Sequence, residues 1–301
     1  MHAAADRSSS SSYPWWTRII RACVFAVAAL VAATTCALQA VTVAAARSVS
    51  GGATFVSVCN FAHRAPDDPI VFPREPGFSH DHTFVGNVST NAFSTLSSLR
   101  SARTTCTPGG DTAAYWAPTL YLDGNPVTPR AAAIYYRRLT IARVRPFPPG
   151  LRMVAGNSYA FQPQSRRVTS WDCAVFKENF YAPRTTQSAA ASSGIPDCSQ
   201  YANLQLRVTF PDCWNGRSLD STDHKSHMAY SVAGRCPASH PVALPSITLV
   251  YSYLALGPGS AMLSSGGQYS GHADFINAWN ERALTKLVDT CLNERVYCPE
   301  G

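Results

Sequence analysis

Histidine and aspartate side chains occur together at three widely separated places in this 301-residue chain. The candidate catalytic residues at these places are His80, His82, Asp223, His224, His227, His272 and Asp274. An imidazole can accept or deliver a proton near neutral pH, and a carboxylate can orient the ring or act as the acid. Such residues suit chemistry at a glycosidic or ester bond, so the pattern predicts a catalytic or binding site.

The same side chains also fit a metal site, because neutral imidazoles bind divalent cations and carboxylates often orient the rings. The alternative prediction is therefore a divalent metal bound by the histidines His80, His82, His224, His227 and His272. His80 and His82 alternate, so their rings point to one face in an extended segment. His224 and His227 are three residues apart and become neighbours in a helical turn. A third interpretation, in which all of these groups only hydrogen-bond loops, stays open.

Aromatic residues indicate a possible ligand surface. Tyr115, Trp116 and Tyr121 are the predicted carbohydrate-binding residues, because flat sugar faces stack on such rings and their polar tips reach sugar hydroxyls. The predicted partner is a cell-wall or environmental polysaccharide. Packing of the same rings in a core is the alternative.

Several function classes are disfavoured by the sequence. It contains no G-x-S-x-G elbow, Walker-type loop or Rossmann fingerprint. The formal net charge is +7, from 25 Lys and Arg against 18 Asp and Glu. The basic residues are scattered and no nucleic-acid-binding module is evident, so we expect no nucleic-acid partner.

The N-terminal segment predicts export from the cytoplasm. Residues 22–46 are uncharged and lack Gly and Pro, and Arg18 and Arg21 precede them. The run is long enough to span a bilayer, and its Ala-rich end resembles a cleavage site, so a signal peptide and a transmembrane anchor both remain open. We expect residues 1–21 to be cytoplasmic and residues 47–301 to form a single extracytoplasmic domain, secreted or anchored by this one helix.

Cysteine usage agrees with an oxidising compartment. An even number of cysteines in an exported domain predicts disulfides rather than free thiols. The eight cysteines after the export segment are Cys59, Cys106, Cys173, Cys198, Cys213, Cys236, Cys291 and Cys298. Many connectivities are possible, and pairing of sequence neighbours is the one we predict: Cys59–Cys106, Cys173–Cys198, Cys213–Cys236 and Cys291–Cys298.

Short apolar runs separated by Gly and Pro turns predict a mainly β fold, a sandwich or jelly-roll-like domain with long loops and several disulfides. The predicted strands are Thr54–Val58, Ala114–Leu122, Ala133–Tyr136, Leu204–Phe210 and Ile247–Leu256. Helical spacing of apolar residues predicts one C-terminal helix from about Ala273 to Cys291.

These motifs resemble a family of exported bacterial and fungal proteins catalogued as domain of unknown function 1996. The resemblance rests on segments that include Ser79–Asn87, Ala114–Tyr121, Pro148–Met153, Phe210–Gly216, Asp223–Tyr230 and His272–Phe275. It implies an exported domain over roughly residues 59–291, and it implies no reaction and no catalytic residues. Asn215 stands where the resemblance leads us to expect Asp.

The sequence therefore predicts an extracytoplasmic protein that binds or cleaves polysaccharide through a cleft rich in His and Asp. The alternatives are a metal-binding surface protein and a structural or adhesive envelope protein without catalysis. Whether the protein is an enzyme stays open at this level.

Overall fold

The computed structural model describes residues 52–174, 191–199, 203–254 and 260–298. The predicted export segment, residues 22–46, lies outside this range. No helix in the described ranges combines the length and the hydrophobicity that crossing a bilayer requires. These ranges are mainly β, as predicted, and their strands form two large sheets and two small ones.

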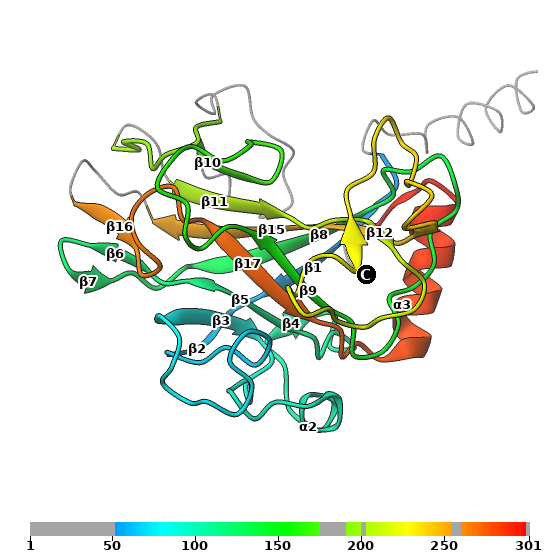
Figure 1. The fold of residues 1–301 in the computed structure, drawn as a ribbon, viewed down its shortest axis with the longest axis horizontal. Helices are drawn as coiled ribbons and strands as arrows, with labels where there is room; N and C mark the ends of the chain where they lie inside the picture. Colours follow the sequence, from blue (N-terminus) through cyan, green and yellow to red (C-terminus); the bar gives the residue numbers. More distant parts are fainter. Residues whose placement is uncertain (1–51, 175–190, 200–202, 255–259, 299–301) are drawn as a thin grey trace, which may run out of the picture. The chain divides into compact units, whose positions relative to one another are not determined.

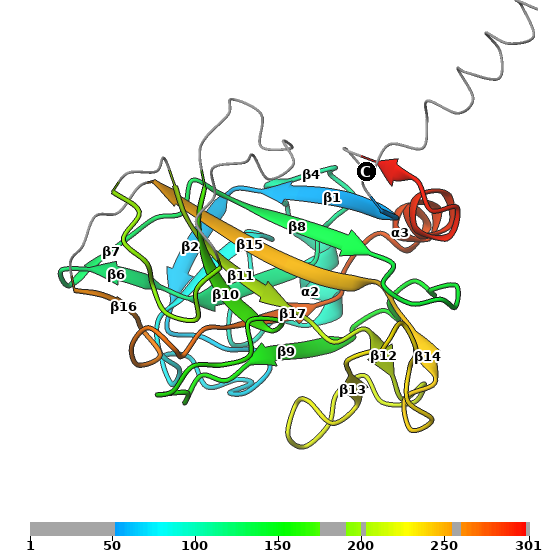
Figure 2. The ribbon, with the colours of Figure 1, turned by 90° about the horizontal axis from the view of Figure 1, so that it is seen from above.

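The larger sheet has seven strands in the order β10-β11-β15-β8-β1-β18, with β4 also pairing with β1. The strands are β1 (Thr54–Cys59), β4 (Cys106–Thr107), β8 (Ala131–Arg137), β10 (Thr169–Ala174), β11 (Asn203–Thr209), β15 (Ser246–Leu254) and β18 (Tyr297–Cys298). Figure 2 shows β1, β8 and β15 side by side.

The second large sheet carries the candidate site. Its strand order is β2-β3-β5-β17-β9 and all of its pairings are antiparallel. The strands are β2 (Phe61–Ala65), β3 (His82–Gly86), β5 (Ala114–Pro118), β9 (Arg152–Gly156) and β17 (His272–Ile276). The two sheets lie against each other, so the predicted sandwich is confirmed (Figure 1).

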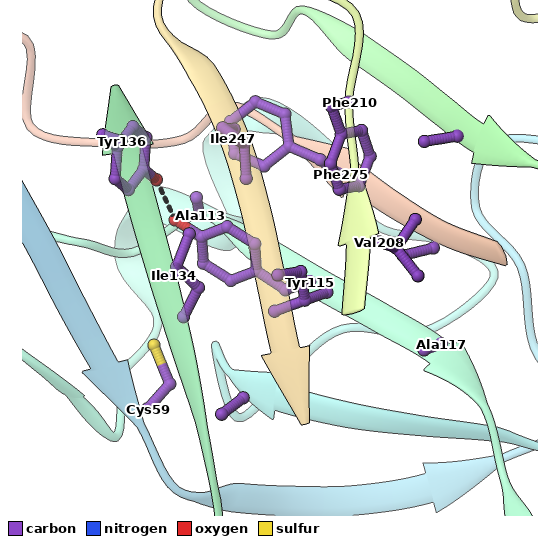
Figure 3. Packing of buried hydrophobic residues seen from close by; sticks show 14 of the residues in the cluster. Cys59, Ala113, Tyr115, Ala117, Ile134, Tyr136, Val208, Phe210, Ile247 and Phe275 are labelled. Atoms are coloured by element: carbon purple, nitrogen blue, oxygen red, sulfur yellow. Dashed lines mark hydrogen bonds between the residues drawn. The ribbon is translucent and has the colours of Figure 1, made fainter. Parts of the chain in front are cut away.

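One hydrophobic core fills the space between the sheets. Tyr115 and Phe275 from the smaller sheet meet Ile134 and Ile247 from the larger one (Figure 3). Their rings and branched side chains are fully buried. Because side chains alternate along a strand, the neighbours of Tyr115 and Phe275 must point to the opposite face of the smaller sheet.

That opposite face is buried as well. Trp116 and Ile276 pack there against Ile70, from the segment between β2 and β3, and against Leu99 of helix α2 (Leu96–Ser101). Figure 1 shows this segment and α2 on the side of the smaller sheet that faces away from the larger one. Polar residues on this face of β3 and β17 are therefore enclosed rather than solvated.

The remaining elements complete the sandwich. Two three-stranded sheets have the orders β13-β12-β14 and β16-β6-β7. Their strands are β6 (Leu120–Leu122), β7 (Asn125–Pro126), β12 (Cys213–Trp214), β13 (Met228–Ala229), β14 (Val242–Ala243) and β16 (Ala261–Leu263). Helix α3 (Glu281–Leu287) begins after the N-cap Asn280 and continues into the π-helix η1 (Val288–Asn293).

The C-terminal helix is confirmed, but its predicted start at Ala273 is wrong. Residues 272–276 form strand β17 and pair with both β5 and β9. Asp274 and Ile276 point to one face while Ala273 and Phe275 pack in the core, so pairing with two neighbours overrides the helical spacing.

All four predicted disulfides are formed. The bridges are Cys59–Cys106, Cys173–Cys198, Cys213–Cys236 and Cys291–Cys298. Such a set is typical of an exported protein from an oxidising compartment.

Candidate functional site

Three imidazoles meet at one end of the smaller sheet. His82 begins β3 and His272 begins β17, and these strands flank β5 on either side. His272 Nε2 lies 3.1 Å from His80 Nε2 and 3.5 Å from His82 Nε2. Residues 190 positions apart in the sequence are thus brought into contact by strand pairing.

The protonation of two of these rings follows from their backbone partners. His82 Nδ1 lies 2.9 Å from the carbonyl of Asp67, and His272 Nδ1 lies 2.8 Å from the carbonyl of Ser270. A carbonyl only accepts, so each Nδ1 carries the hydrogen and each neutral ring presents an Nε2 lone pair. The two lone pairs face each other, which requires a bound cation or a donated proton between them. His80 can donate its Nε2 hydrogen to His272.

Burial keeps all three imidazoles neutral. Loss of solvation lowers the pKa of His80 to about 4 and that of His272 to about 3. It also holds the pKa of His82 well below its usual range, with the two neighbouring imidazoles adding to the effect. Neutral imidazole is the form that binds metals.

Two carboxyl groups lie beside the imidazole of His82. Asp274, two residues along β17 from His272, is 1% exposed, and neither of its oxygens has a hydrogen-bond partner in the described structure. Asp68 accepts from the amides of Ile70 and Val71 at 2.9 and 3.0 Å. Ligand atoms of Asp68, His82 and Asp274 all lie within 4.8 Å of one another.

The electrostatics of this carboxyl pair are unfavourable without a counter-charge. Burial first, and then the charge of Asp68, raises the pKa of Asp274 well above its usual range. Burial also raises the pKa of Asp68, although the amides of Val71 and Ile70 oppose that shift. A buried, unpaired carboxylate costs several kcal/mol, so a cation at this point would relieve a large penalty.

The geometry of the nitrogen donors fits a tetrahedral metal. Zinc–nitrogen bonds of 2.0–2.1 Å at tetrahedral angles place two nitrogens about 3.3 Å apart, and the two measured separations are 3.1 and 3.5 Å. Donation of Nδ1–H to a carbonyl is also the usual support of a metal-binding histidine. Imidazoles with one or two carboxylates could therefore hold Zn²⁺ or another first-row transition metal.

A second group of potential ligands, Cys59, Cys106 and Asp111, does not form a metal site. Its two sulfurs are joined in a disulfide. Thiolates are the form of cysteine that binds a metal, so this group is structural.

The histidines at 224 and 227 do not share a ligand. Residues 221–227 form turns rather than a helix, so the expected helical neighbours separate. His227 is buried, with Nδ1 2.9 Å from Ser221 Oγ and Nε2 2.7 Å from the Arg152 carbonyl. Both nitrogens are occupied, which corrects the prediction of His227 as a metal ligand.

Two other polar residues of that segment, Asp223 and His224, bond to neighbours within it. Asp223 is exposed, and its Oδ1 accepts from Ser221 Oγ and from the amides of Lys225 and Ser226. These bonds hold the pKa of its carboxyl well below the usual range, and they give Asp223 a role in shaping the turn. His224 pairs instead with Asp220, at 3.0 Å between Nδ1 and Oδ1.

The carbohydrate prediction is corrected for two of its three residues. Tyr115 and Trp116 are fully buried, on opposite faces of β5. A central strand covered on both sides leaves no ring face for a sugar. Tyr121 is half-buried, with its hydroxyl 3.1 Å from Asp81 Oδ2, and its role in binding stays a prediction.

One residue beside His82 and Asp274 was missed by the sequence reasoning. Asp68 carries no motif of its own. Its place in the group depends on side-chain direction, which the sequence does not specify.

Comparison with known proteins gives a family but no activity. Searches of curated proteins and of solved structures each returned no match. The model of the family described as "Domain of unknown function (DUF1996)" matches residues 68–279. This range includes Asp68, His80, His82, His272 and Asp274 and more than two thirds of the sequence. The chain therefore belongs to the DUF1996 family.

Proposed function

We propose that this protein is an extracytoplasmic metal-binding protein with one transition-metal centre. The ligands are the Nε2 atoms of His80, His82 and His272 and a carboxylate oxygen of Asp274, with Asp68 beside them. The observation that carries the proposal is that two groups of potential ligands share His82. His80 and His272 approach it on one side, and Asp68 and Asp274 on the other, and Asp274 has no hydrogen-bond partner within the described ranges.

The donor set favours Zn²⁺ among common cations. Ca²⁺ and Mg²⁺ prefer oxygen ligands, whereas imidazole suits Zn²⁺, Cu²⁺, Ni²⁺ and Fe²⁺. Polysaccharide binding remains a prediction, and burial of Tyr115 and Trp116 removes two of the three residues on which it rested. A purely structural role for the three imidazoles leaves the Asp274 carboxyl without a partner, so the metal centre is the better proposal.

Metal content tests the proposal directly. The full-length chain, produced without a polyhistidine tag and freed of metal, should bind one equivalent of Zn²⁺ in calorimetric titration. His272→Ala should abolish binding, and His80→Ala should weaken it at least tenfold. His240→Ala is the matched control, because His240 bonds the Ser226 carbonyl at 2.9 Å and takes no part in the site. Binding below a tenth of an equivalent by the unaltered chain would contradict the proposal.

A second variant keeps the proposal testable even where a histidine substitution prevents folding. Asp274→Asn replaces a buried carboxyl group whose ionisation is unfavourable without a cation, so it should stabilise the metal-free protein by about 1–3 kcal/mol and destabilise the Zn²⁺ form. Chemical denaturation with and without Zn²⁺ measures this reversal of sign. Destabilisation of both forms by similar amounts would argue against a cation at Asp274.

A further inference from the structure

Four aliphatic side chains are exposed at one end of the larger sheet. Leu139 and Ile141, in the segment after β8, are 52% and 57% exposed. Val232 is 75% exposed, and Val296, directly before β18, is 45% exposed. Single exposed aliphatic residues are common, whereas a contiguous group of them marks an interaction surface.

Backbone contacts join the first three of these residues. Val232 and Arg235 exchange both backbone hydrogen bonds, at 2.9 and 3.0 Å, and close a turn whose central residues Ala233 and Gly234 have φ of 50° and 73°. The amide of Ile141 donates to the Gly234 carbonyl at 2.9 Å, and a Cβ at Gly234 would lie 3.3 Å from Ile141 Cγ1. The turn and the segment after β8 therefore form one surface.

The beginning of β1 belongs to the same surface. The amide of Arg138 donates to the Ala53 carbonyl at 3.1 Å, and the amide of Thr54 donates to the Val296 carbonyl at 3.3 Å. Thr54 also pairs with Tyr297 of β18. Figure 2 shows this end of the larger sheet beside helix α3. The first strand of the domain thus starts next to the exposed aliphatic residues.

Arginines border the aliphatic residues, and most of them lack a counter-charge. Arg138, Arg143, Arg235 and Arg295 each lie within two residues of an exposed aliphatic residue or in the turn itself. Glu294 pairs with Arg143 at 3.5 Å, and no ion pair among the described residues neutralises the other three. The charges of Arg295 and Arg143 lower the pKa of the Arg138 guanidinium, after the larger effect of burial. This cluster of like charges would be stabilised by an anionic partner.

Two properties of this surface fit a lipid bilayer with anionic headgroups. Arginines near a membrane surface are attracted to anionic lipids, and aliphatic side chains enter the boundary between headgroups and acyl chains. The order of the chain favours the same partner, because the predicted apolar segment ends at Ala46 and the seven residues from there to Ala53 span at most about 25 Å. A retained anchor therefore keeps Ala53 close to a bilayer, and a cleaved signal peptide leaves a peripheral contact.

We propose that the four exposed aliphatic residues and the four arginines form a docking surface for the outer face of a membrane that contains anionic phospholipid. The aliphatic side chains supply apolar contact, and the arginines bind the headgroup phosphates. The docking surface includes none of the proposed metal ligands, so the inference stands independently of the metal centre.

Hydrogen–deuterium exchange of the full chain in lipid nanodiscs tests the charged part of the docking surface. One set of discs contains phosphatidylcholine alone, and the other contains equal parts of phosphatidylcholine and phosphatidylglycerol. Amides of residues 139–143 and 232–236 should exchange more slowly in the anionic discs, and high salt should reverse the difference. Arg235→Gln combined with Arg295→Gln should weaken docking about tenfold or more and abolish most of the protection.

A serine variant tests the apolar part in the same discs. Val232→Ser changes a side chain that is 75% exposed, so the protein should fold normally and lose protection at both segments. Leu254→Ser is the matched control, because Leu254 is 61% exposed at the opposite end of β15 from Ser246, which pairs at the docking end. Arg74→Gln combined with Arg103→Gln is the control for charge, because both arginines are exposed elsewhere on the domain.

Three outcomes would overturn membrane docking. The first is equal exchange of the two segments in neutral and anionic discs. The second is loss of protection in the control variants as large as in Val232→Ser. The third is protection that appears without lipid and grows with protein concentration, which would identify a second copy of the chain as the partner.

Discussion

Hydrogen-bond partners of single polar residues separate structural groups from functional ones. His227 uses both ring nitrogens within the fold, and His63 bonds the Thr90 carbonyl at 2.8 Å while its ring stacks on Phe84. Asp274 is as deeply buried as His227, but neither of its oxygens has a partner among the described residues. Buried polar groups are nearly always paired, so a buried carboxyl group with both oxygens unpaired marks Asp274 as a candidate ligand.

A second buried carboxyl group, Asp111, has a structural explanation. Its oxygens accept from Ser57 Oγ at 2.6 Å and from the Tyr115 hydroxyl, which also contacts the hydroxyl of Tyr136 (Figure 3). Trp279 Nε1 donates to Tyr136 at 2.8 Å and completes the chain. Burial raises the pKa of Asp111 to about 7, against the opposing effect of these donors.

This raised pKa predicts a pH-dependent loss of stability. An unfolded Asp has a pKa of about 3.9, so between pH 4 and 7 the folded protein holds a proton that the unfolded chain has released. Stability from this group is therefore present at low pH and falls as pH rises through that window, by about 3 kcal/mol between pH 5 and pH 8.

Denaturation of the metal-free protein at both pH values, with disulfides intact, measures the effect. Asp111→Asn should reduce the difference in unfolding free energy between pH 5 and pH 8 by that amount. Parallel pH dependence in the variant and the parent chain would show that Asp111 ionises normally.

Strand register determines the site at the scale of secondary-structure elements. His82 pairs with Pro118 of β5, and Asp274 pairs with Trp116 two residues back along the same strand. Antiparallel pairing on both sides of β5 thus brings His82 and His272, which begin the two flanking strands, to the same end of the sheet. Of the five strands in this sheet, each of five residues, β5 was the only one that the sequence predicted, and the residues of β17 were assigned to the C-terminal helix.

The close approach of β9 to β17 predicts an effect of Gly156 on the site. A Cβ at Gly156 would lie 2.5 Å from the Gly271 carbonyl oxygen and 2.8 Å from His272 Cα. Gly156→Ala should therefore destabilise the protein by more than 2 kcal/mol and weaken Zn²⁺ binding, because backbone would have to move at a ligand.

Gly124→Ala provides the matched control for this substitution. Gly124 has a similar φ of +77°, but nothing lies within 4 Å of an added Cβ. It should cost only the left-handed strain of about 1–2 kcal/mol and leave Zn²⁺ affinity unchanged. Equal effects of the two substitutions would show that crowding at His272 is unimportant.

For the whole molecule, the four disulfides differ in how much chain they constrain. Cys59–Cys106 spans 47 residues and joins β1 to β4 in the core, whereas Cys291–Cys298 spans 7. In the chain-entropy description, these loops correspond to about 4 and about 2.4 kcal/mol of stabilisation.

Paired substitution to Ala should therefore cost more stability at Cys59 and Cys106 than at Cys291 and Cys298, by at least about 1.5 kcal/mol. Thermal denaturation of the two double variants compares them. A larger loss from the C-terminal pair would mean that local packing around η1 and β18 outweighs loop length.

The sequence by itself determined the β class, the presence of disulfides and the three segments from which polar residues come. These features depend on local alternation, turn residues and the even number of cysteines in the predicted exported domain, whereas the pairing of the cysteines was chosen among many connectivities and is given by the structure. Only the tertiary structure decided that His80, His82 and His272 meet, that Asp68 joins them, and that His227 does not. The reason is that strand register and the direction of each side chain are set by pairing between distant segments, and a shift of one residue would turn every ring to the other face.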